Sequence, residues 1–288
     1  MKQLLAGVLF ATLWASASVA TKIGLRAAEP LMITNVRFLI AGALMLAWAH
    51  GLRRHRLPNA SEWWPLTLYG ALNGAIYLGA FAIAMQEVTA GIGTLAVGLN
   101  PLVISVLSAV WLKKRIAPTV WAGLCLGLAG VGLATFPALV DSTATPKGIV
   151  ILSLSMLSYS IGTIYFAGRS WDLPRLAING WQITAAALLL LPLTAAATHW
   201  ERNHFDASFW GSVAWLVLPV SVGAVQLWLY LLKLDPVKAA LWLFLCPVLG
   251  FFYAWLFLNE PITPYAIAGT VLVILGLYLG QRAPRKQP

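Results

Sequence analysis

The sequence predicts an all-α membrane protein with ten transmembrane helices, arranged as two inverted five-helix repeats. Three observations lead to this fold class. The 288-residue chain is 60% hydrophobic and only 10% charged, with a mean hydropathy of +0.81, whereas soluble domains carry about 25% charged residues. Its apolar residues fall into ten runs, each long enough to cross a bilayer. The two halves of the chain also resemble each other when one is shifted along the other.

Short polar, Pro or Gly segments separate the apolar runs and set the expected span limits. The expected spans are 3–25, 31–50, 66–86, 90–112, 118–136, 147–168, 175–197, 209–231, 237–257 and 264–281. An even number of spans places both termini on one side of the membrane. The first run could also be read as a cleavable signal peptide, but its removal would delete the first span and break the repeat.

The basic residues support this topology. With ten spans, 14 of the 19 Lys and Arg residues fall on the side of the termini and 3 on the other, while Lys22 and Arg37 lie within or at the edge of spans. Loops rich in Lys and Arg stay in the cytoplasm, so we expect both termini there. Because the basic residues lie between apolar runs, the expected partner is a lipid bilayer and not nucleic acid.

A shift of 146 positions aligns the fourth and fifth spans with the ninth and tenth. It places Pro101 on Pro247, Leu112 on Leu258, Ile116 on Ile262, Pro118 on Pro264, Ala122 on Ala268, Gly123 on Gly269 and Gly130 on Gly276. The expected units are residues 1–137 and 146–283. Five is an odd number, so the second unit enters the membrane from the opposite face. Inverted halves can exchange conformations and open one cavity to either side in turn, which favours a small-solute transporter.

Several short motifs give the chain a resemblance to a known family. They are Trp14-Ala15-Ser16 followed by Lys22, Asn100-Pro101, and Leu258-Asn259-Glu260-Pro261-Ile262-Thr263. Together with the ten-helix plan, they resemble the drug/metabolite transporter superfamily, specifically its ten-helix, EamA-like bacterial exporters. The resemblance covers nearly the whole chain and looks like the branch that exports aromatic and other neutral amino acids. It implies a multi-pass protein of the bacterial inner membrane.

Polar and aromatic residues away from the span ends are the candidate substrate-binding residues, because a polar group in hydrocarbon needs a partner or a water-filled cavity. The candidates are Trp14, Ser16, Ser18, Asn73, Tyr77 and Asn100 in the first half, and Tyr159, Thr163, Asn179, Gln182, Gln226, Trp228 and Trp242 in the second. Such a set suits a ligand with an apolar side chain and an amino-acid backbone. Each residue alone could equally form a helix–helix hydrogen bond or an interfacial anchor.

Two prolines at matched positions are candidate hinges. Pro101 and Pro247 each remove a backbone hydrogen bond inside a span and should bend it. Paired interruptions of this kind point to a transport site, and Gly98 and Gly250 beside them ease bending. The alternative is a static kink used for packing.

Lys22 and Arg37 are the two cations nearest to membrane depth. They are candidates for a gate or for attracting a substrate carboxylate. The alternative is an interfacial anchor, since both lie toward the outer ends of their helices and could reach the membrane surface.

The remaining titratable residues narrow the chemistry. All nine acids and all four histidines lie in or beside loops, so no carboxylate or imidazole is expected at mid-membrane to carry a proton or bind a cation. Passive export of neutral or zwitterionic metabolites is therefore favoured over proton-coupled export of drugs or other metabolites.

No spacing suggests a metal site, a cofactor or a catalytic constellation, so an enzyme is not expected. A multi-pass protein that transports nothing is the alternative from another class. Glycine steps such as Gly123 and Gly127 are expected to pack helices within a monomer, with dimerisation as the other use of such steps.

Overall fold

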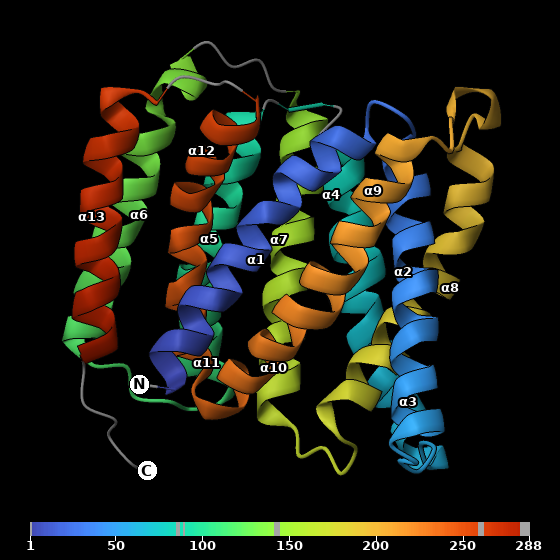
Figure 1. The fold of residues 1–288 in the computed structure, drawn as a ribbon. Coiled ribbons are helices and arrows are strands. Elements are labelled where there is room, and N and C mark those ends of the chain that lie inside the picture. Colours follow the sequence, from blue (N-terminus) through green and yellow to red (C-terminus); the bar gives the residue numbers. More distant parts are fainter. Residues whose placement is uncertain (1, 85–86, 89, 141–144, 259–261, 283–288) are drawn as a thin grey trace.

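The computed structural model describes residues 2–84, 87–88, 90–140, 145–258 and 262–282. Within these residues the chain forms ten helical spans that alternate in direction (Figure 1). The spans are α1 (Lys2–Gly24); α2 (Pro30–Leu46) with η1 (Ala47–Leu52); α3 (Ala60–Gly70) with η2 (Ala71–Ile76) and α4 (Tyr77–Ala84); α5 (Ala90–Trp111); α6 (Pro118–Val140); α7 (Pro146–Gly168); α8 (Arg175–Ala197); α9 (Ala207–Trp215) with η4 (Leu216–Ala224) and α10 (Val225–Leu234); α11 (Pro236–Leu241) with η5 (Trp242–Phe244) and α12 (Leu245–Leu258); and α13 (Pro264–Arg282). A short turn, η3 (Trp200–Arg202), lies between α8 and α9.

The predicted fold class is confirmed. Among the described residues, nine helices are long and apolar enough to cross a membrane, and α5 is apolar from Ala96 to Trp111. α1 begins and α13 ends at the same end of the bundle, which we call the terminal end (Figure 1). The other end is called the distal end.

Prolines and capping side chains start most spans. Five helices begin with proline, namely α2, α6, α7, α11 and α13, because the first turn of a helix has N–H groups without partners in any case. The third span begins at Ala60 and not at the predicted residue 66. Its start is fixed by Glu62, whose Oε2 accepts a hydrogen bond from the backbone N of Asn59 at 2.7 Å and closes a capping box.

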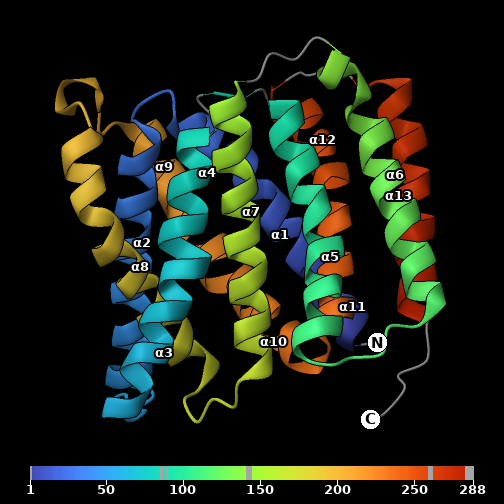
Figure 2. The same ribbon diagram turned by 180° about the vertical axis from the view of Figure 1, so that it is seen from behind.

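The two halves pack with the same pattern of neighbours. α2 packs on α8 and α6 packs on α13, so the second and fifth spans each contact their own counterpart. α1 packs on α12 as α7 packs on α5, and α1 packs on the eighth span as α7 packs on the third. Figures 1 and 2 show the α6–α13 pair at one edge of the bundle and the α2–α8 pair at the other. Exchanging the halves leaves this pattern unchanged, as an inverted repeat requires.

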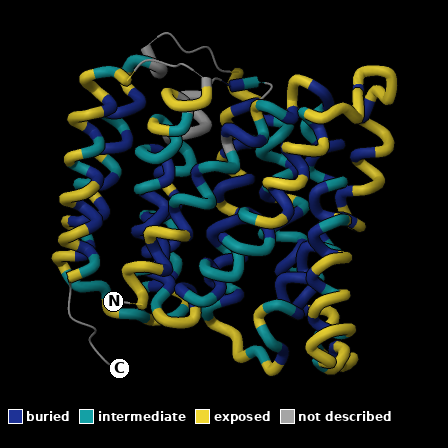
Figure 3. Tube along the Cα trace, in the orientation of Figure 1, coloured by how far each residue is buried: buried dark blue, intermediate teal, exposed yellow. Residues whose placement is uncertain are grey.

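Glycines bring α6 and α13 together. A Cβ atom on Gly123 would lie 2.6 Å from the carbonyl oxygen of Gly276, and one on Gly130 would lie 2.7 Å from that of Gly269. These glycine steps are therefore used inside one chain. Large apolar side chains such as Ile267 and Val271 are exposed on the outer side of α13, and Figure 3 shows buried residues concentrated where helices face one another. Such an exterior suits lipid.

Two matched spans contain π-helical segments. η2 lies in the third span and η4 in the eighth, and a shift of 146 positions moves residues 71 and 76 onto 217 and 222, inside η4. Among the described residues, one more such segment, η1, ends the second span. π-Helical turns are frequent at functional sites. These two segments carry Asn73 and Ser221 into the middle of the bundle.

Candidate functional site

A small cavity lies at the centre of the bundle, where the two halves of the chain meet. Its volume is about 30 Å³. Both halves line it: Trp14, Arg37, Phe38, Tyr69, Asn73, Gly74 and Leu78 from the first, and Tyr159, Gln182, Ile183, Ser221, Val225 and Trp228 from the second. We call it the central cavity. Small-molecule pockets usually measure about 300 to 1,000 Å³, so the described conformation is a contracted one.

Some lining residues occupy similar positions in the two repeats. Trp14 is the 13th of 23 residues in α1, and Tyr159 is the 14th of 23 in α7. These helices are the first spans of the two units, so each unit places an aromatic side chain at mid-membrane. Arg37 and Gln182 are each the eighth residue of their helix, α2 or α8, and the shift of 146 positions places Arg37 on Ile183, one residue beyond Gln182. Similar depths in the two units therefore carry different side chains.

Arg37 is a buried cation. Its relative exposure is 8%, and it lies about 10 Å along its helix from the distal end, at 1.5 Å per residue. Its side chain turns inward onto Ser221 and lines the cavity. An interfacial anchor would instead reach toward the membrane surface. The ion pairs of the described residues all involve other side chains. A buried charge without a counter-charge is costly in a membrane and marks functional positions.

A chain of hydrogen bonds joins Arg37 to Gln182 along the cavity wall. Nε of Arg37 donates to Oγ of Ser221 at 2.8 Å, and the carbonyl oxygen of Ser221 accepts from Nδ2 of Asn179 at 2.8 Å. Oδ1 of Asn179 then accepts from Nε2 of Gln182 at 2.9 Å. Because a carbonyl oxygen can only accept, this chain fixes the orientation of both amides. Oε1 of Gln182 is thereby an acceptor, and it has no partner.

Two further lining residues carry buried polar atoms without partners. They are the hydroxyl of Tyr159, which makes no bond of good geometry although the Thr163 hydroxyl lies near it, and Nε1 of Trp228, and both residues are 2% exposed. Most buried polar atoms in proteins are hydrogen-bonded. Three unpaired atoms around one cavity, one of them a pure donor and one a pure acceptor, therefore indicate a site for a polar ligand.

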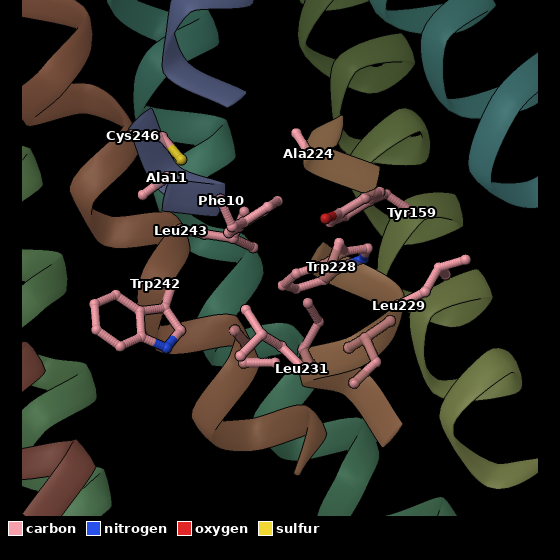
Figure 4. Packing of buried hydrophobic residues seen from close by; sticks show 14 of the residues in the cluster. Phe10, Ala11, Tyr159, Ala224, Trp228, Leu229, Leu231, Trp242, Leu243 and Cys246 are labelled. Carbon is pink, nitrogen blue, oxygen red and sulfur yellow. The ribbon is translucent and has the colours of Figure 1, made fainter. Parts of the chain in front are cut away.

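Aromatic side chains separate the central cavity from the terminal end. The ring of Phe10 stacks on Trp228 with centroids 4.9 Å apart, and Tyr159 stacks on the same indole at 6.1 Å. Figure 4 shows Tyr159 projecting from α7 toward the side of Phe10, with Trp228 below it. Phe10 is fully buried, so this layer closes the cavity on that side.

Hydrogen bonds join α1 to α9 toward the distal end. Oγ of Ser212 donates to the carbonyl oxygen of Ala20 at 2.6 Å, and Nε1 of Trp215 donates to Oγ of Ser16 at 3.0 Å. Gly24 packs directly on Ser212. These contacts hold α1 against α9 on the distal side of Trp14.

A larger hollow of about 240 Å³ lies at the terminal end. We call it the terminal vestibule, and its lining residues are Gln3, Leu4, Leu231, Leu234, Asp235, Lys238, Ala239, Trp242 and Gln281. α1 and α10 line both hollows, with Leu4 and Leu231 at the vestibule and Trp14 and Trp228 at the cavity. The two hollows therefore lie along the same two helices, with Phe10 between Leu4 and Trp14 on α1.

The structure brings five of the expected substrate-binding residues together at the central cavity: Trp14, Asn73, Tyr159, Gln182 and Trp228. Two more support them. The ring of Tyr77 lies 4.7 Å from that of Tyr159, and Asn179 orients Gln182.

The other expected residues lie elsewhere in this conformation. Ser16 bonds α1 to α9, Asn100 donates to Sδ of Met156 between α5 and α7, and Gln226 donates to the carbonyl oxygen of Arg175 at the terminal end. Thr163 is buried without a hydrogen-bond partner for its hydroxyl, and Trp242 lines the terminal vestibule against Gly7. The side chain of Ser18 lies outside the described residues.

The candidate hinges have unequal surroundings. Pro101 sits inside the continuous helix α5, whereas Pro247 follows the 3₁₀ turn η5. Gly98 packs against Val131, but a Cβ atom on Gly250 would meet nothing within 4 Å. Lys22, the other candidate gate, is exposed in the last turn of α1 and does not line the central cavity.

Sequence reasoning missed two polar lining residues, Tyr69 and Ser221. Tyr69 precedes Asn73 by four positions, and Ser221 precedes Trp228 by seven, so helical spacing places each pair on one face. That spacing was the available signal. Among the described residues, the cavity lining contains no carboxylate, imidazole or thiol, and no group of His, Cys, Asp and Glu could hold a metal ion.

Comparison with known proteins adds a family. A model of the EamA-like transporter family matches residues 1–136 and 146–280. An uncharacterized transporter of Synechocystis sp. is 25% identical over 283 residues, covering 93% of this chain and 86% of its own length. The uncharacterized inner membrane transporter YedA of Escherichia coli is 28% identical over 295 residues, covering 98% of this chain and 94% of its own length.

A solved crystal structure has the same fold. It superimposes with a TM-score of 0.81 at 20% sequence identity, and the match covers 96% of both chains. Identity at this level supports the fold alone.

Proposed function

Because this chain belongs to the EamA-like transporter family, and is therefore a membrane transporter and not an enzyme, we propose that it exports neutral amino acids, aromatic ones included, and related small metabolites. The proposed mechanism is alternating access, in which the two inverted units open the central cavity first to one side and then to the other. The proposed location is the inner membrane of a bacterium.

One observation carries the proposal. The central cavity lies between the two units and combines aromatic surface from Trp14 and Trp228 with a cation and unpaired polar atoms. Aromatic walls suit an apolar side chain, and the polar groups suit an amino-acid backbone. The cavity measures about 30 Å³, so it must widen before it can hold an amino acid.

The proposed direction of transport, outward from the cytoplasm, rests on the features of the terminal end of the bundle. The terminal end carries the excess of basic residues expected of a cytoplasmic face. The terminal vestibule lies at that end and leads toward the Phe10–Trp228 stack. In our proposal the vestibule receives solute from the cytoplasm, and separation of the stack admits it to the central cavity.

The proposed bending sites are Pro101 with Gly98 and Pro247 with Gly250. The matched π-helical segments η2 and η4 add a second pair of irregular elements, and they contact the central cavity directly through Asn73, Gly74 and Ser221. Irregular helical turns exchange backbone hydrogen bonds at lower cost than regular ones, so they suit spans that must change shape.

Counterflow tests the function. The purified full chain would be reconstituted into liposomes loaded with unlabelled L-phenylalanine, and labelled L-phenylalanine would be added outside. A carrier exchanges the two, so the label should transiently accumulate above its external concentration. Protein-free liposomes and liposomes loaded with sucrose should show no such overshoot. A chain that gives no overshoot with phenylalanine, tryptophan, leucine, valine or threonine would overturn the amino-acid assignment.

A further inference from the structure

The polar residues of the central cavity divide into two groups of opposite character. On the α2 side, the guanidinium of Arg37 donates from Nε to Oγ of Ser221 at 2.8 Å. On the α8 side, Gln182 presents an amide oxygen that is an unpaired acceptor. Arg37 and Gln182 are each the eighth residue of the second span of their unit, so the two groups come from opposite units.

The donor side fits a carboxylate. Nε of Arg37 is bonded to Ser221, and the other guanidinium nitrogens remain as donors in the fork geometry that carboxylates match. A buried cation without a neighbouring acid is stabilised by an anion that enters the cavity. The aromatic lining from Phe38, Tyr69 and Trp228 favours an organic anion over an inorganic one.

The acceptor side fits an ammonium group. The orientation of Gln182 is fixed by Asn179, whose own amide nitrogen donates to the carbonyl oxygen of Ser221. Oε1 therefore cannot be exchanged for a donor by an amide flip without breaking this chain. A neutral acceptor beside aromatic faces binds an ammonium group through a hydrogen bond and cation–π attraction.

We propose that Arg37 and Gln182 bind the two ends of a zwitterionic α-amino acid, the carboxylate at Arg37 and the ammonium group at Gln182. Ser221 positions both, since its hydroxyl holds Arg37 and its carbonyl oxygen holds Asn179. The proposal rests on the proposed function and narrows it, because it requires both charges on the substrate. It also orients the solute, with its carboxylate toward the α2 side of the cavity.

The test compares two ligand analogues in two variants, each of which lacks one of the proposed binding groups. Inhibition of L-phenylalanine counterflow would be measured with L-phenylalanine, with L-phenylalaninamide, which lacks the carboxylate, and with 3-phenylpropanoate, which lacks the ammonium group. The wild-type chain should prefer L-phenylalanine over either analogue by about tenfold or more, since a hydrogen bond to a charged group contributes about 1.5–3 kcal/mol.

Each variant should remove one preference. Arg37→Gln should abolish the preference over the amide and keep the preference over 3-phenylpropanoate. Gln182→Met should abolish the preference over 3-phenylpropanoate and keep the preference over the amide. Asn35→Ala is the folding control, because Asn35 lies two residues from Arg37, bonds to the carbonyl oxygen of Ala187 and to Thr194, and does not line the cavity. Lys22→Gln is the charge control, and both controls should keep the two preferences.

The outcomes separate the two proposals. If the wild-type chain moves phenylalanine but does not distinguish it from the analogues, or if Arg37→Gln keeps the preference over the amide, the pairing is overturned and the proposed function stands. Inhibition by sulfate or phosphate as strong as that by the amino acid would make Arg37 a simple anion site and also overturn the pairing. Absence of counterflow with every neutral amino acid would overturn both.

Discussion

The hydroxyl group of Tyr159 lies at mid-membrane and makes no hydrogen bond of good geometry, although the residue is 2% exposed and the Thr163 hydroxyl lies near it one turn along α7. Leaving such a group unpaired costs about 1–3 kcal/mol, so its presence suits a role other than stability. We predict that Tyr159→Phe leaves the folded chain at least as stable as the wild type. The same change should raise the KM for phenylalanine counterflow about five- to tenfold, because one hydrogen bond to the solute is lost. Thermal unfolding and initial rates measure the two effects.

Tyr253 offers the opposite control. Its hydroxyl donates to the carbonyl oxygen of Thr12 at 3.2 Å and so bonds α12 to α1 away from the cavity. Tyr253→Phe should lower stability by about 1 kcal/mol and leave KM unchanged. If Tyr159→Phe behaves like Tyr253→Phe, the Tyr159 hydroxyl has no part in binding.

The sequence predicted some of the residues that line the cavity but not all of them. Polarity inside an apolar run identified Trp14, Asn73 and Tyr159, because such residues must face a partner or a cavity. The same rule could not separate them from Asn100, whose amide bonds two helices together. Whether a polar residue lines a cavity or bonds two helices together depends on the rotation of its helix. Neighbouring helices set that rotation, and the local sequence does not.

At the scale of the helix, glycines let the backbones of α6 and α13 approach each other closely. A Cβ atom on Gly276 would lie 2.6 Å from the carbonyl oxygen of Gly123 and 2.6 Å from the backbone N of Gly127. Both obstacles are backbone atoms, so no side-chain rotation relieves them. We predict that Gly276→Ala destabilises the folded chain by about 1–3 kcal/mol, as overpacking does.

Gly132 provides the matched control on the same helix pair. A Cβ atom at this position of α6 would meet nothing within 4 Å, so Gly132→Ala should be neutral or slightly stabilising. Thermal unfolding of the two purified variants in one detergent makes the comparison. Equal midpoints would mean that α6 and α13 can separate freely, and that the close approach contributes nothing to stability.

The sequence predicted the helices better than their irregularities. Hydropathy placed all ten spans, since bilayer thickness fixes their length. It missed the start of the third span because Trp63 and Trp64 look interfacial, although Asn59 and Glu62 carry a capping-box pattern. The segments η2 and η4 were not foreseen either. Pro219 marks η4, but η2 contains no proline, so tertiary packing decides where that helix widens.

At the scale of the whole molecule, the exchange symmetry of the helix contacts links structure to mechanism. α1 makes contacts on both sides of the central cavity, through the Phe10–Trp228 stack toward the terminal end and the Ser212 hydrogen bond to Ala20 toward the distal end. α7 is its counterpart in the second unit. In the proposed alternating-access mechanism, a tilt of α1 would separate one of these contacts and keep the other.

The same global view predicts transport down the solute's own gradient, without obligatory proton coupling. A coupled carrier needs a group that binds a proton in one state and releases it in the other near neutral pH. Among the described residues, the cavity lining offers Arg, Tyr, Trp, Asn, Gln and Ser side chains but no acid or imidazole.

The loop acid Glu87 does not fill this gap. The hydroxyl of Thr145 donates to its carboxylate at 2.8 Å and Lys147 donates at 3.1 Å, and these bonds hold the pKa of Glu87 below its usual range. A lowered pKa keeps a carboxylate ionised as pH rises or falls between about 5.5 and 8. Glu87 therefore keeps one charge state across that range and carries no proton there.

Proteoliposomes loaded with phenylalanine at equal concentrations inside and outside provide the measurement. With the membrane voltage clamped, a pH difference of either sign should leave the two concentrations equal, because no proton moves with the solute. Glu87→Gln serves as the control and should behave like the wild type. Net accumulation on one side that reverses with the sign of the pH difference would contradict passive transport, and its loss in Glu87→Gln would identify the loop carboxylate as the proton site.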